Sequence, residues 1–280
     1  MFKKKDSKYI LAHGCSFTDF NFVSKKKDAD VSFVKWPEIL GERLGVPVKN
    51  LAGSGFDNVT IFDETIDQIL KEKPWMVVIG ITEIPRFRMY GVQALQCIPS
   101  WQMHHSKWLK DMARDTTHEQ LLEPWLEWLW SRHNERLSWV FRHMVDNHWK
   151  RIIRLQRLCD QLEIKLIMTH LLRPINYHAY FKAIPKQLGI ETKISKTSLL
   201  ESMMTPNFHH VDDKSFIGWP NMLDIKWGWH ILDRDKPNKV KHLNWTDDCV
   251  IDRVEDIHPN KKGHELIAEC FYEHYQKTYT

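Results

Sequence analysis

The sequence predicts an α/β fold in which helices cover both faces of a parallel β-sheet. Short apolar runs of strand length recur over the first 170 residues, and stretches with the apolar spacing of amphipathic helices separate them. This alternation is typical of a parallel sheet, because each strand must be joined to the next by a crossover helix. With 280 residues, 42% of them hydrophobic, the chain can form one large domain with insertions.

The elements follow in order along the chain. Four apolar runs are predicted to be buried strands: 9–12, 46–51, 76–81 and 164–169. Helical spacing predicts helices between them, over 36–44, 61–70 and 152–162, and a last helix over 264–274. Gly45 follows the first helix and Pro74 the second, and both are typical stop signals.

Two insertions are predicted within a single domain that spans residues 1–280. Residues from about 89 to 150 carry seven of the thirteen tryptophans and are predicted to form a helical insertion. Residues from about 172 to 248 carry five prolines and are predicted to be irregular. We expect most tryptophans to pack the insertions, and a minority to line the substrate crevice.

Composition excludes several classes of function. A net charge of +4 that comes partly from the lysine runs 3–5 and 25–27 does not indicate nucleic-acid binding. The five cysteines are scattered without a CxxC pair, which favours a reducing cytoplasm over a disulfide framework or a zinc site. The apolar runs are too short for a signal peptide or a membrane span. We therefore expect a cytoplasmic protein, and the oligomeric state stays open.

Three loops are predicted to meet at the carboxyl edge of the sheet, where ligands of open parallel sheets bind. Ser16 follows the first strand, Gly53-Ser54-Gly55 follows the second and Thr82-Glu83 follows the third. A serine nucleophile needs a general base and donors for the developing oxyanion. His258, in a turn before the last helix, is the candidate base.

Four ordered sequence blocks carry a family resemblance. GCSFT at 14–18, NLAGSGFDN at 50–58, VVIGITE at 77–83 and DIHPNKKGHELIAE at 256–269 together resemble the SGNH hydrolases, or GDSL esterase/lipase superfamily. The resemblance implies a flavodoxin-like three-layer α/β/α fold, and ester hydrolysis or acyl transfer without a cofactor. It further implies that Ser16 is the nucleophile and an oxyanion donor through its N–H, that the Gly55 N–H is a second donor, and that His258 is the base.

Two departures from the family pattern concern the oxyanion side of the site. Cys15 stands where the family usually has Asp, a variant that resembles microbial and phage relatives, and is interpreted as a small buried filler. Thr82 stands where the family has an Asn that donates to the oxyanion, and Arg86 is a possible substitute donor. Glu83, Arg86 and Asn58 are predicted substrate contacts, and Asn58 alternatively caps the second helix.

A third departure leaves the triad acid open. The family places the acid three residues before the histidine, where this chain has Glu255. Asp256 lies two residues before His258 and would point to the same side of an extended segment. Asp256 is slightly preferred, and a Ser–His dyad is the remaining option.

No metal site is predicted. The histidine pairs at 104–105 and 209–210 are adjacent along the chain, where two side chains rarely share one metal, and no HExxH motif occurs. His264 is expected to face the surface of the last helix.

The leading hypothesis is a serine esterase that hydrolyses an O-acyl ester, with a small-molecule or carbohydrate ester such as an O-acetyl sugar as substrate. The alternatives are a binding or structural protein, for example a viral component, that keeps the fold without the reaction, and an acyltransferase that uses the same site.

Overall fold

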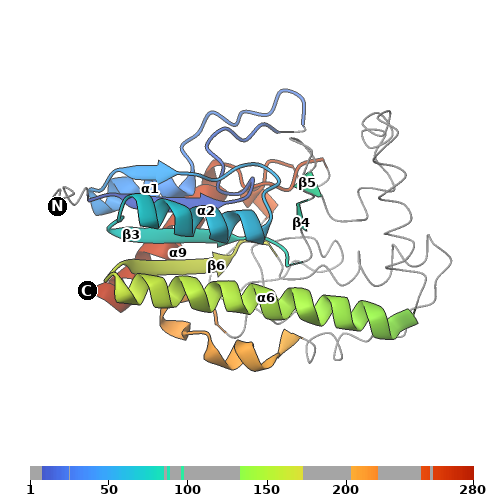
Figure 1. Cartoon of the computed structure of the whole chain (residues 1–280). Helices are drawn as coiled ribbons and strands as arrows, with labels where there is room; N and C mark the ends of the chain where they lie inside the picture. The colour runs from blue at the N-terminus through green and yellow to red at the C-terminus, as the bar shows by residue number, and fades with distance from the viewer. Residues whose placement is uncertain are drawn as a thin grey trace.

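A four-stranded parallel sheet forms the centre of the protein (Figure 1). The computed structural model describes residues 8–24, 26–84, 87–88, 96–97, 133–172, 203–219, 247–252 and 255–280. The strands are β1 (Ile10–Gly14), β2 (Val48–Asn50), β3 (Met76–Ile81) and β6 (Lys165–His170), in the order β2-β1-β3-β6. Every pair in this sheet is parallel, which confirms the predicted sheet.

Helices cover both faces of the sheet and complete three layers. One face packs against α2 (Asn58–Lys71) and α6 (His133–Gln161), and the other against α1 (Trp36–Leu44) and α9 (Lys261–Tyr279). Successive residues of β1 alternate between the two cores, because side chains of a strand point to opposite faces. Leu11 joins the α2/α6 core, while Ile10 and Ala12 join the α1/α9 core. The predicted α/β/α fold is confirmed.

Local sequence signals explain where several helices begin and end. Gly45 ends α1 in the left-handed conformation (φ 63°), as its position after the apolar pattern predicts. The Asn260 side chain accepts a hydrogen bond from the Gly263 N–H at 3.1 Å and begins α9. The predicted helix over 152–162 is only the final part of α6, which has 29 residues.

The predicted insertions lie largely outside the described residues, so they stay predictions. A short antiparallel pair, β4 (Phe87–Arg88) and β5 (Gln96–Cys97), follows β3. In the second, residues 203–219 include the 3₁₀ turns η2 (Pro206–His210) and η3 (Asp213–Ser215). Phe216 then forms a parallel bridge with Met168 and extends the sheet beyond β6. A further 3₁₀ turn, η5 (Asp247–Cys249), precedes the last block.

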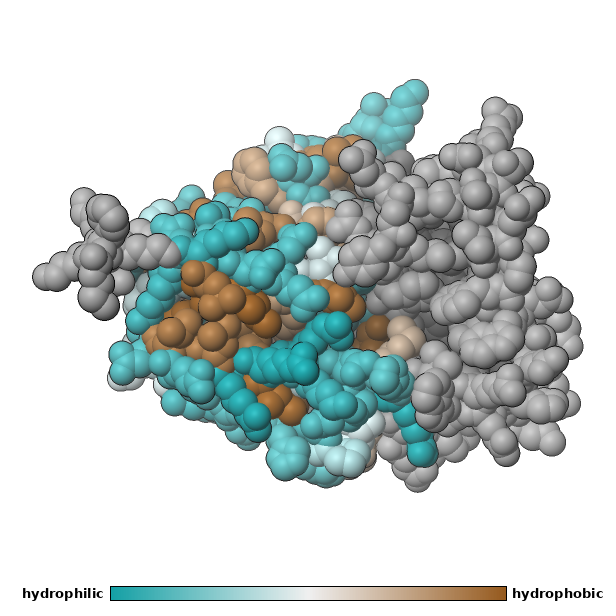
Figure 2. All heavy atoms as spheres, in the orientation of Figure 1, coloured by the Kyte–Doolittle hydropathy of each residue, from teal (hydrophilic) through white to brown (hydrophobic). Residues whose placement is uncertain are grey.

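Apolar side chains also reach the surface on the side that carries α2 and α6 (Figure 2). Leu70 of α2 is 65% exposed, although most of the apolar face of this helix is buried in the core. None of the described helices is both long and apolar enough to cross a membrane.

Candidate active site

Ser16 lies half-buried in a tight turn directly after β1. The turn is closed by the N–H groups of Thr18 and Asp19, which donate to the Cys15 carbonyl at 2.8 and 3.0 Å. Cys15 itself is fully buried in the α1/α9 core, as predicted for a small filler. The turn therefore holds Ser16 at the carboxyl edge of the sheet.

Two glycines on neighbouring strands make room for this turn. A Cβ at Gly14 would lie 2.3 Å from the Thr18 Oγ1, and one at Gly80 would lie 2.6 Å from the same atom. Gly14 and Gly80 are register partners on β1 and β3. The buried Thr18 hydroxyl occupies the space that two side chains would fill, and it accepts a hydrogen bond from the Trp36 Nε1–H at 3.3 Å. The Ser16 turn can occupy this position because neither Gly14 nor Gly80 carries a Cβ atom.

His258 meets Ser16 across 242 positions of sequence. The Ser16 Oγ and the His258 Nε2 are 2.8 Å apart. On the other side of the ring, the His258 Nδ1 lies 2.5 Å from the Asp256 Oδ1, and the His258 backbone N–H donates to the same oxygen at 3.1 Å. The structure therefore brings Ser16, His258 and Asp256 into one hydrogen-bonded line.

The charge state of Asp256 sets the tautomer of His258. Asp256 is 3% exposed, and burial alone would raise its pKa, but hydrogen bonds from His258 and Ser24 outweigh burial and hold the pKa at about 2. An ionised carboxylate only accepts hydrogen bonds, so the proton of the neutral imidazole is on Nδ1. This leaves the Nε2 lone pair for the Ser16 hydroxyl, which is the arrangement that a general base needs.

Aromatic rings hold the imidazole in this orientation. The ring centroid of Phe22 is 4.2 Å from that of His258, and the centroid of Phe17 is 5.1 Å away. Both phenylalanines are buried. Rotation of the His258 ring would break the contacts with both rings as well as the two hydrogen bonds.

Glu255, the other carboxylate that the sequence left open, is not brought to His258. Its side chain is exposed, and its backbone N–H donates to the Asp252 Oδ1 at 3.0 Å. Asp256, two residues before His258, is the carboxylate that reaches the ring, because its Oδ1 binds both the backbone N–H and the Nδ1 of His258.

The loop that carries Gly55 is tied to the Ser16 turn. The Gly53 N–H donates to the Gly14 carbonyl at 3.3 Å, and Asp19 accepts from the Ser54 N–H at 2.8 Å and from the Ser54 hydroxyl at 2.6 Å. Gly55 has a φ of 81°, which favours glycine.

Two backbone N–H groups of these segments, those of Ser16 and Gly55, differ from their neighbours. Within the described part of the chain, no residue accepts a hydrogen bond from the N–H of Ser16 or of Gly55. A developing oxyanion is the type of ligand that such paired N–H groups bind.

Asn58 binds the loop after β3 and does not cap α2. Its amide donates to the carbonyls of Thr82 and Glu83 at 3.1 and 3.2 Å and accepts from the Thr82 N–H at 3.0 Å. Asp57 is the cap, because its side chain accepts from the Thr60 N–H at 2.7 Å, so the capping interpretation of Asn58 was wrong by one residue.

The role of the loop after β3 in substrate binding stays a prediction. The Thr82 hydroxyl is buried and has no hydrogen-bond partner among the described residues. A third oxyanion donor at Thr82 and substrate contacts of Glu83 and Asn58 remain expectations. Arg86 lies outside the described residues.

The expectation that His264 faces the helix surface was wrong. His264 is 2% exposed, and its Nδ1 accepts a hydrogen bond from the Trp36 N–H at 3.2 Å. Burial lowers the pKa of His264 to about 3, and the charges of Lys35 and His258 act in the same direction. The ring is buried because α1 packs on this end of α9, and no local pattern in the sequence indicates that contact.

No three or more His, Cys, Asp or Glu side chains in the described ranges are arranged to hold a metal ion. Of the two adjacent histidine pairs, His209 and His210 are exposed on η2, and the pair at 104–105 lies outside the described residues. The expected absence of a metal or cofactor stays a prediction.

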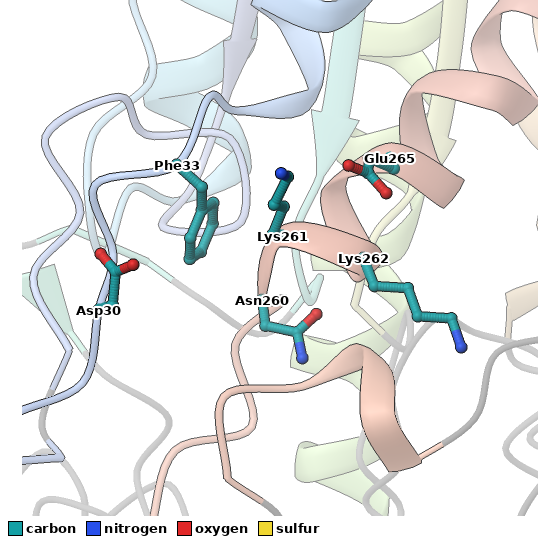
Figure 3. A pocket seen from close by; sticks show the side chains of 6 residues that line it. All are labelled: Asp30, Phe33, Asn260, Lys261, Lys262 and Glu265. Carbon is teal, nitrogen blue, oxygen red and sulfur yellow. The ribbon is translucent and has the colours of Figure 1, made fainter.

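An open pocket of about 510 Å³ lies beside the N-terminus of α9 (Figure 3). It is lined by Asp30, Phe33, Asn260, Lys261, Lys262 and Glu265. Ser16, His258 and Asp256 do not line it, and the Asn260 side chain is occupied by the Gly263 N–H and by the carbonyls of Asp248 and Val250. The pocket is therefore separate from the candidate active site.

No family model matches the chain, and neither does any curated protein. Solved structures match it over nearly its whole length at low identity. An acetylxylan esterase from Geobacillus stearothermophilus, a catalytic mutant, is 12% identical with a TM-score of 0.45, over 98% of this chain and 96% of that one. A candidate SGNH hydrolase from Slackia heliotrinireducens is 13% identical with a TM-score of 0.37, over 95% and 98%. An alpha/beta hydrolase from the metagenome of Lake Arreo, Spain, is 13% identical with a TM-score of 0.42, over 98% and 97%.

The strand order and the helices on both faces give the chain a three-layer α/β/α fold, and the Ser16 turn, the Gly55 loop and the His258 turn meet at one edge of its sheet. Similarity at this level says nothing about the reaction, so the function is inferred from the geometry of the site.

Proposed function

We propose that this protein is a serine hydrolase that cleaves carboxylic esters, with Ser16 as nucleophile, His258 as general base and Asp256 as the acid that orients the base. The observation that carries the proposal is the 2.8 Å contact between the Ser16 Oγ and the His258 Nε2, with Asp256 on the opposite ring nitrogen. Nucleophile, base and orienting carboxylate in this order form the arrangement that activates a serine hydroxyl.

The reaction would proceed in two steps. In the first, the Ser16 Oγ attacks the ester carbonyl while the His258 Nε2 takes the hydroxyl proton, and the imidazolium then protonates the departing alcohol. In the second, the Nε2 takes a proton from water, the hydroxide attacks the acyl-serine carbonyl, and the proton returns to the Ser16 Oγ as the carboxylic acid leaves. Asp256 stays ionised throughout and stabilises the imidazolium.

Two backbone groups would bind the oxyanion of each tetrahedral intermediate. The N–H groups of Ser16 and Gly55 lack acceptors among the described residues, and the Asp19–Ser54 hydrogen bonds join the two segments that carry them. Preorganised donors of this kind each contribute roughly 2.7–4 kcal/mol to transition-state stabilisation.

The substrate is proposed to be a small-molecule or carbohydrate O-acyl ester, with O-acetyl as the first choice. This preference follows from the tryptophans expected in the insertion, and chemically acetylated xylan and acetylated monosaccharides are suitable first compounds. The chemistry of the proposed triad needs no cofactor.

Hydrolysis of p-nitrophenyl acetate tests the proposal directly. We expect the wild type to release p-nitrophenol, Ser16→Ala to fall to the background rate, and Ser32→Ala to keep the wild-type rate. Ser32 is a matched control because it is an exposed loop serine whose hydroxyl binds only Asp30 among the described residues. Equal rates for the wild type and Ser16→Ala would reject the proposal.

A fluorophosphonate probe separates the hydrolase from the alternatives. An activated serine reacts with the probe, so mass spectrometry should find one adduct per chain, on Ser16. Absence of the adduct would favour a protein that binds through this fold without catalysis. An adduct together with faster turnover in the presence of alcohols or sugars would favour an acyltransferase.

A further inference from the structure

The short segment from Asp19 to Ser24 contacts the loop that carries Gly55, the base His258 and the acid Asp256. Its first residue, Asp19, binds the loop that carries Gly55, and its last residue, Ser24, binds the acid Asp256. Between them, the ring of Phe22 lies against the ring of His258. Neither Asp19 nor Ser24 belongs to the residues that the family resemblance implies.

We propose that Asp19 and Ser24 are positioning residues of the reaction, one for the oxyanion donors and the other for the acid. This inference rests on the proposed function and names two residues that the triad and its oxyanion donors do not include. The substrate is not expected to touch either side chain.

The contacts of Ser24 give its hydroxyl a fixed direction. The Lys26 N–H donates to the Ser24 Oγ at 3.0 Å, so the serine's own proton is directed to the Asp256 Oδ2. The other carboxylate oxygen of Asp256 accepts from the His258 side chain and backbone. Each oxygen of the acid thus has its own donor, and the carboxylate cannot rotate away from His258 without losing the bond from Ser24.

A second contact joins the same two stretches of chain. The Lys26 Nζ lies 2.6 Å from the Asp252 Oδ2, and the Asp252 N–H donates to the Asp256 carbonyl at 2.7 Å. The turn that carries the acid is therefore held from its backbone as well as from its side chain.

Asp19 acts on the opposite side of the serine. One carboxylate oxygen accepts from the N–H and the hydroxyl of Ser54, and the other accepts from the Asn21 N–H at 2.8 Å. Asp19 is 7% exposed, so these bonds form largely out of water. Ser54 directly precedes Gly55, and Asp19 belongs to the Ser16 turn. The carboxylate therefore fixes the spacing between the two proposed oxyanion donors.

Single variants test the two roles separately, with p-nitrophenyl acetate as substrate. Ser24→Ala is expected to lower kcat about tenfold with KM unchanged, because it removes one hydrogen bond that acts through Asp256. Ser24→Thr keeps the hydroxyl and should restore kcat to within about threefold. Asp19→Asn should lower kcat by about ten- to a hundredfold, again with KM unchanged, since it weakens the bonds to Ser54. Ser32→Ala and Asp28→Asn are the matched controls, because both residues are exposed and lie on the neighbouring loop.

The double variant distinguishes positioning from local unfolding. If Asp19 and Ser24 support different parts of the site, the loss in kcat for Asp19→Asn/Ser24→Ala should be the product of the two single losses. If either change simply releases the segment, the kcat of the double variant will be no lower than that of the less active single variant. That result would overturn the proposal. Fluorophosphonate labelling should still reach one adduct per chain in every variant, only more slowly.

The outcomes also separate this proposal from the proposed function. An active wild type whose Asp19→Asn and Ser24→Ala variants keep full kcat would overturn the positioning roles and leave the triad intact. A wild type that neither hydrolyses the ester nor reacts with the fluorophosphonate would overturn both the hydrolase and the positioning roles.

Discussion

The Ser16 Oγ and the His258 Nε2 lie 2.8 Å apart although 242 positions separate the two residues in sequence. Ser16 follows β1, an inner strand of the sheet, and His258 lies in the turn before α9. Both residues lie at the carboxyl edge of the sheet. The local turns around Ser16 and around His258 do not by themselves bring the two side chains together. The contact depends on the packing of α9 and its preceding turn against the rest of the domain.

Asp256→Asn should abolish most of the activity without unfolding the protein. The amide can present an N–H to the His258 Nδ1 in place of the carboxylate oxygen, which favours the wrong tautomer and removes the charge that stabilises the imidazolium. We expect kcat for p-nitrophenyl acetate to fall by about 10³-fold or more. Glu255→Gln is the matched control, because Glu255 is exposed and does not contact His258, and it should stay within about twofold of the wild type. A similar loss in both variants would contradict the assignment of the acid.

Gly14→Ala should cost both stability and activity. The new Cβ would lie 2.3 Å from the Thr18 Oγ1 and 2.9 Å from the Gly80 carbonyl oxygen, so the Ser16 turn must move. Overpacking of this kind costs typically about 1–3 kcal/mol, which urea denaturation measures.

Gly45→Ala provides the comparison for this prediction. It meets no atom within 4 Å but has a φ of 63°, so it should lose about 1 kcal/mol of stability through backbone strain alone. Its kcat should equal that of the wild type. A Gly14→Ala variant with normal kcat would contradict the prediction, because it would show that the Ser16 turn keeps its position when a Cβ is added at Gly14.

The sequence predicts the parts of this protein that local chemistry decides. The apolar runs place β1, β3 and β6, because a parallel strand that is buried on both faces must be apolar on both. β2 also lies within its predicted range, but it is a half-buried strand at the edge of the sheet. Gly45 marks the end of α1 because a left-handed residue is needed there. The serine and the histidine are found because their blocks follow predicted elements in the family order, and the Asp256 alternative is found because a two-residue spacing can point both side chains one way.

Tertiary contacts decide what the sequence leaves open or misses. The choice between Asp256 and Glu255 depends on a turn in which the backbone N–H and the ring of His258 both bind the Asp256 Oδ1. His264 is buried by α1, a helix more than 200 positions away. The contacts of Ser24 with Asp256 likewise join distant segments, and a lone loop serine carries no signal of them. For Asp19, its place directly after the nucleophile block at 14–18 is the one signal that could have drawn attention to it.

Asn58→Ala should reveal whether this residue shapes the loop after β3 or contacts substrate. The change leaves the buried Thr82 N–H without its acceptor, and it removes two hydrogen bonds to the carbonyls of Thr82 and Glu83. We expect a loss of about 1–3 kcal/mol in the free energy of unfolding. KM values for p-nitrophenyl acetate and p-nitrophenyl butyrate should change by the same factor, whereas a substrate contact would alter the ratio of the two.

Acidification should destabilise the protein through its buried histidines, of which His264 offers the clearest test. Burial first, and the charges of Lys35 and His258 second, lower the pKa of His264 to about 3, against about 6.5 in the unfolded chain. Below pH 6.5 the unfolded state binds a proton that the folded state does not, so the contribution of His264 to stability is complete above that pH and decreases as the pH falls toward 3. The slope approaches about 1.4 kcal/mol per pH unit.

The variant His264→Asn isolates this effect, because the amide oxygen can still accept from the Trp36 N–H but does not titrate. Urea denaturation at pH 7.0, 5.5 and 4.5 should give a shallower decline for the variant, by about 1.4 kcal/mol per pH unit between the two lower values. Asp256, with a pKa of about 2, contributes to the pH dependence only below about pH 4, outside this window. Parallel declines for the two proteins would mean that His264 is protonated in the folded state, and hence that the contact between α1 and α9 is looser than the structure has it.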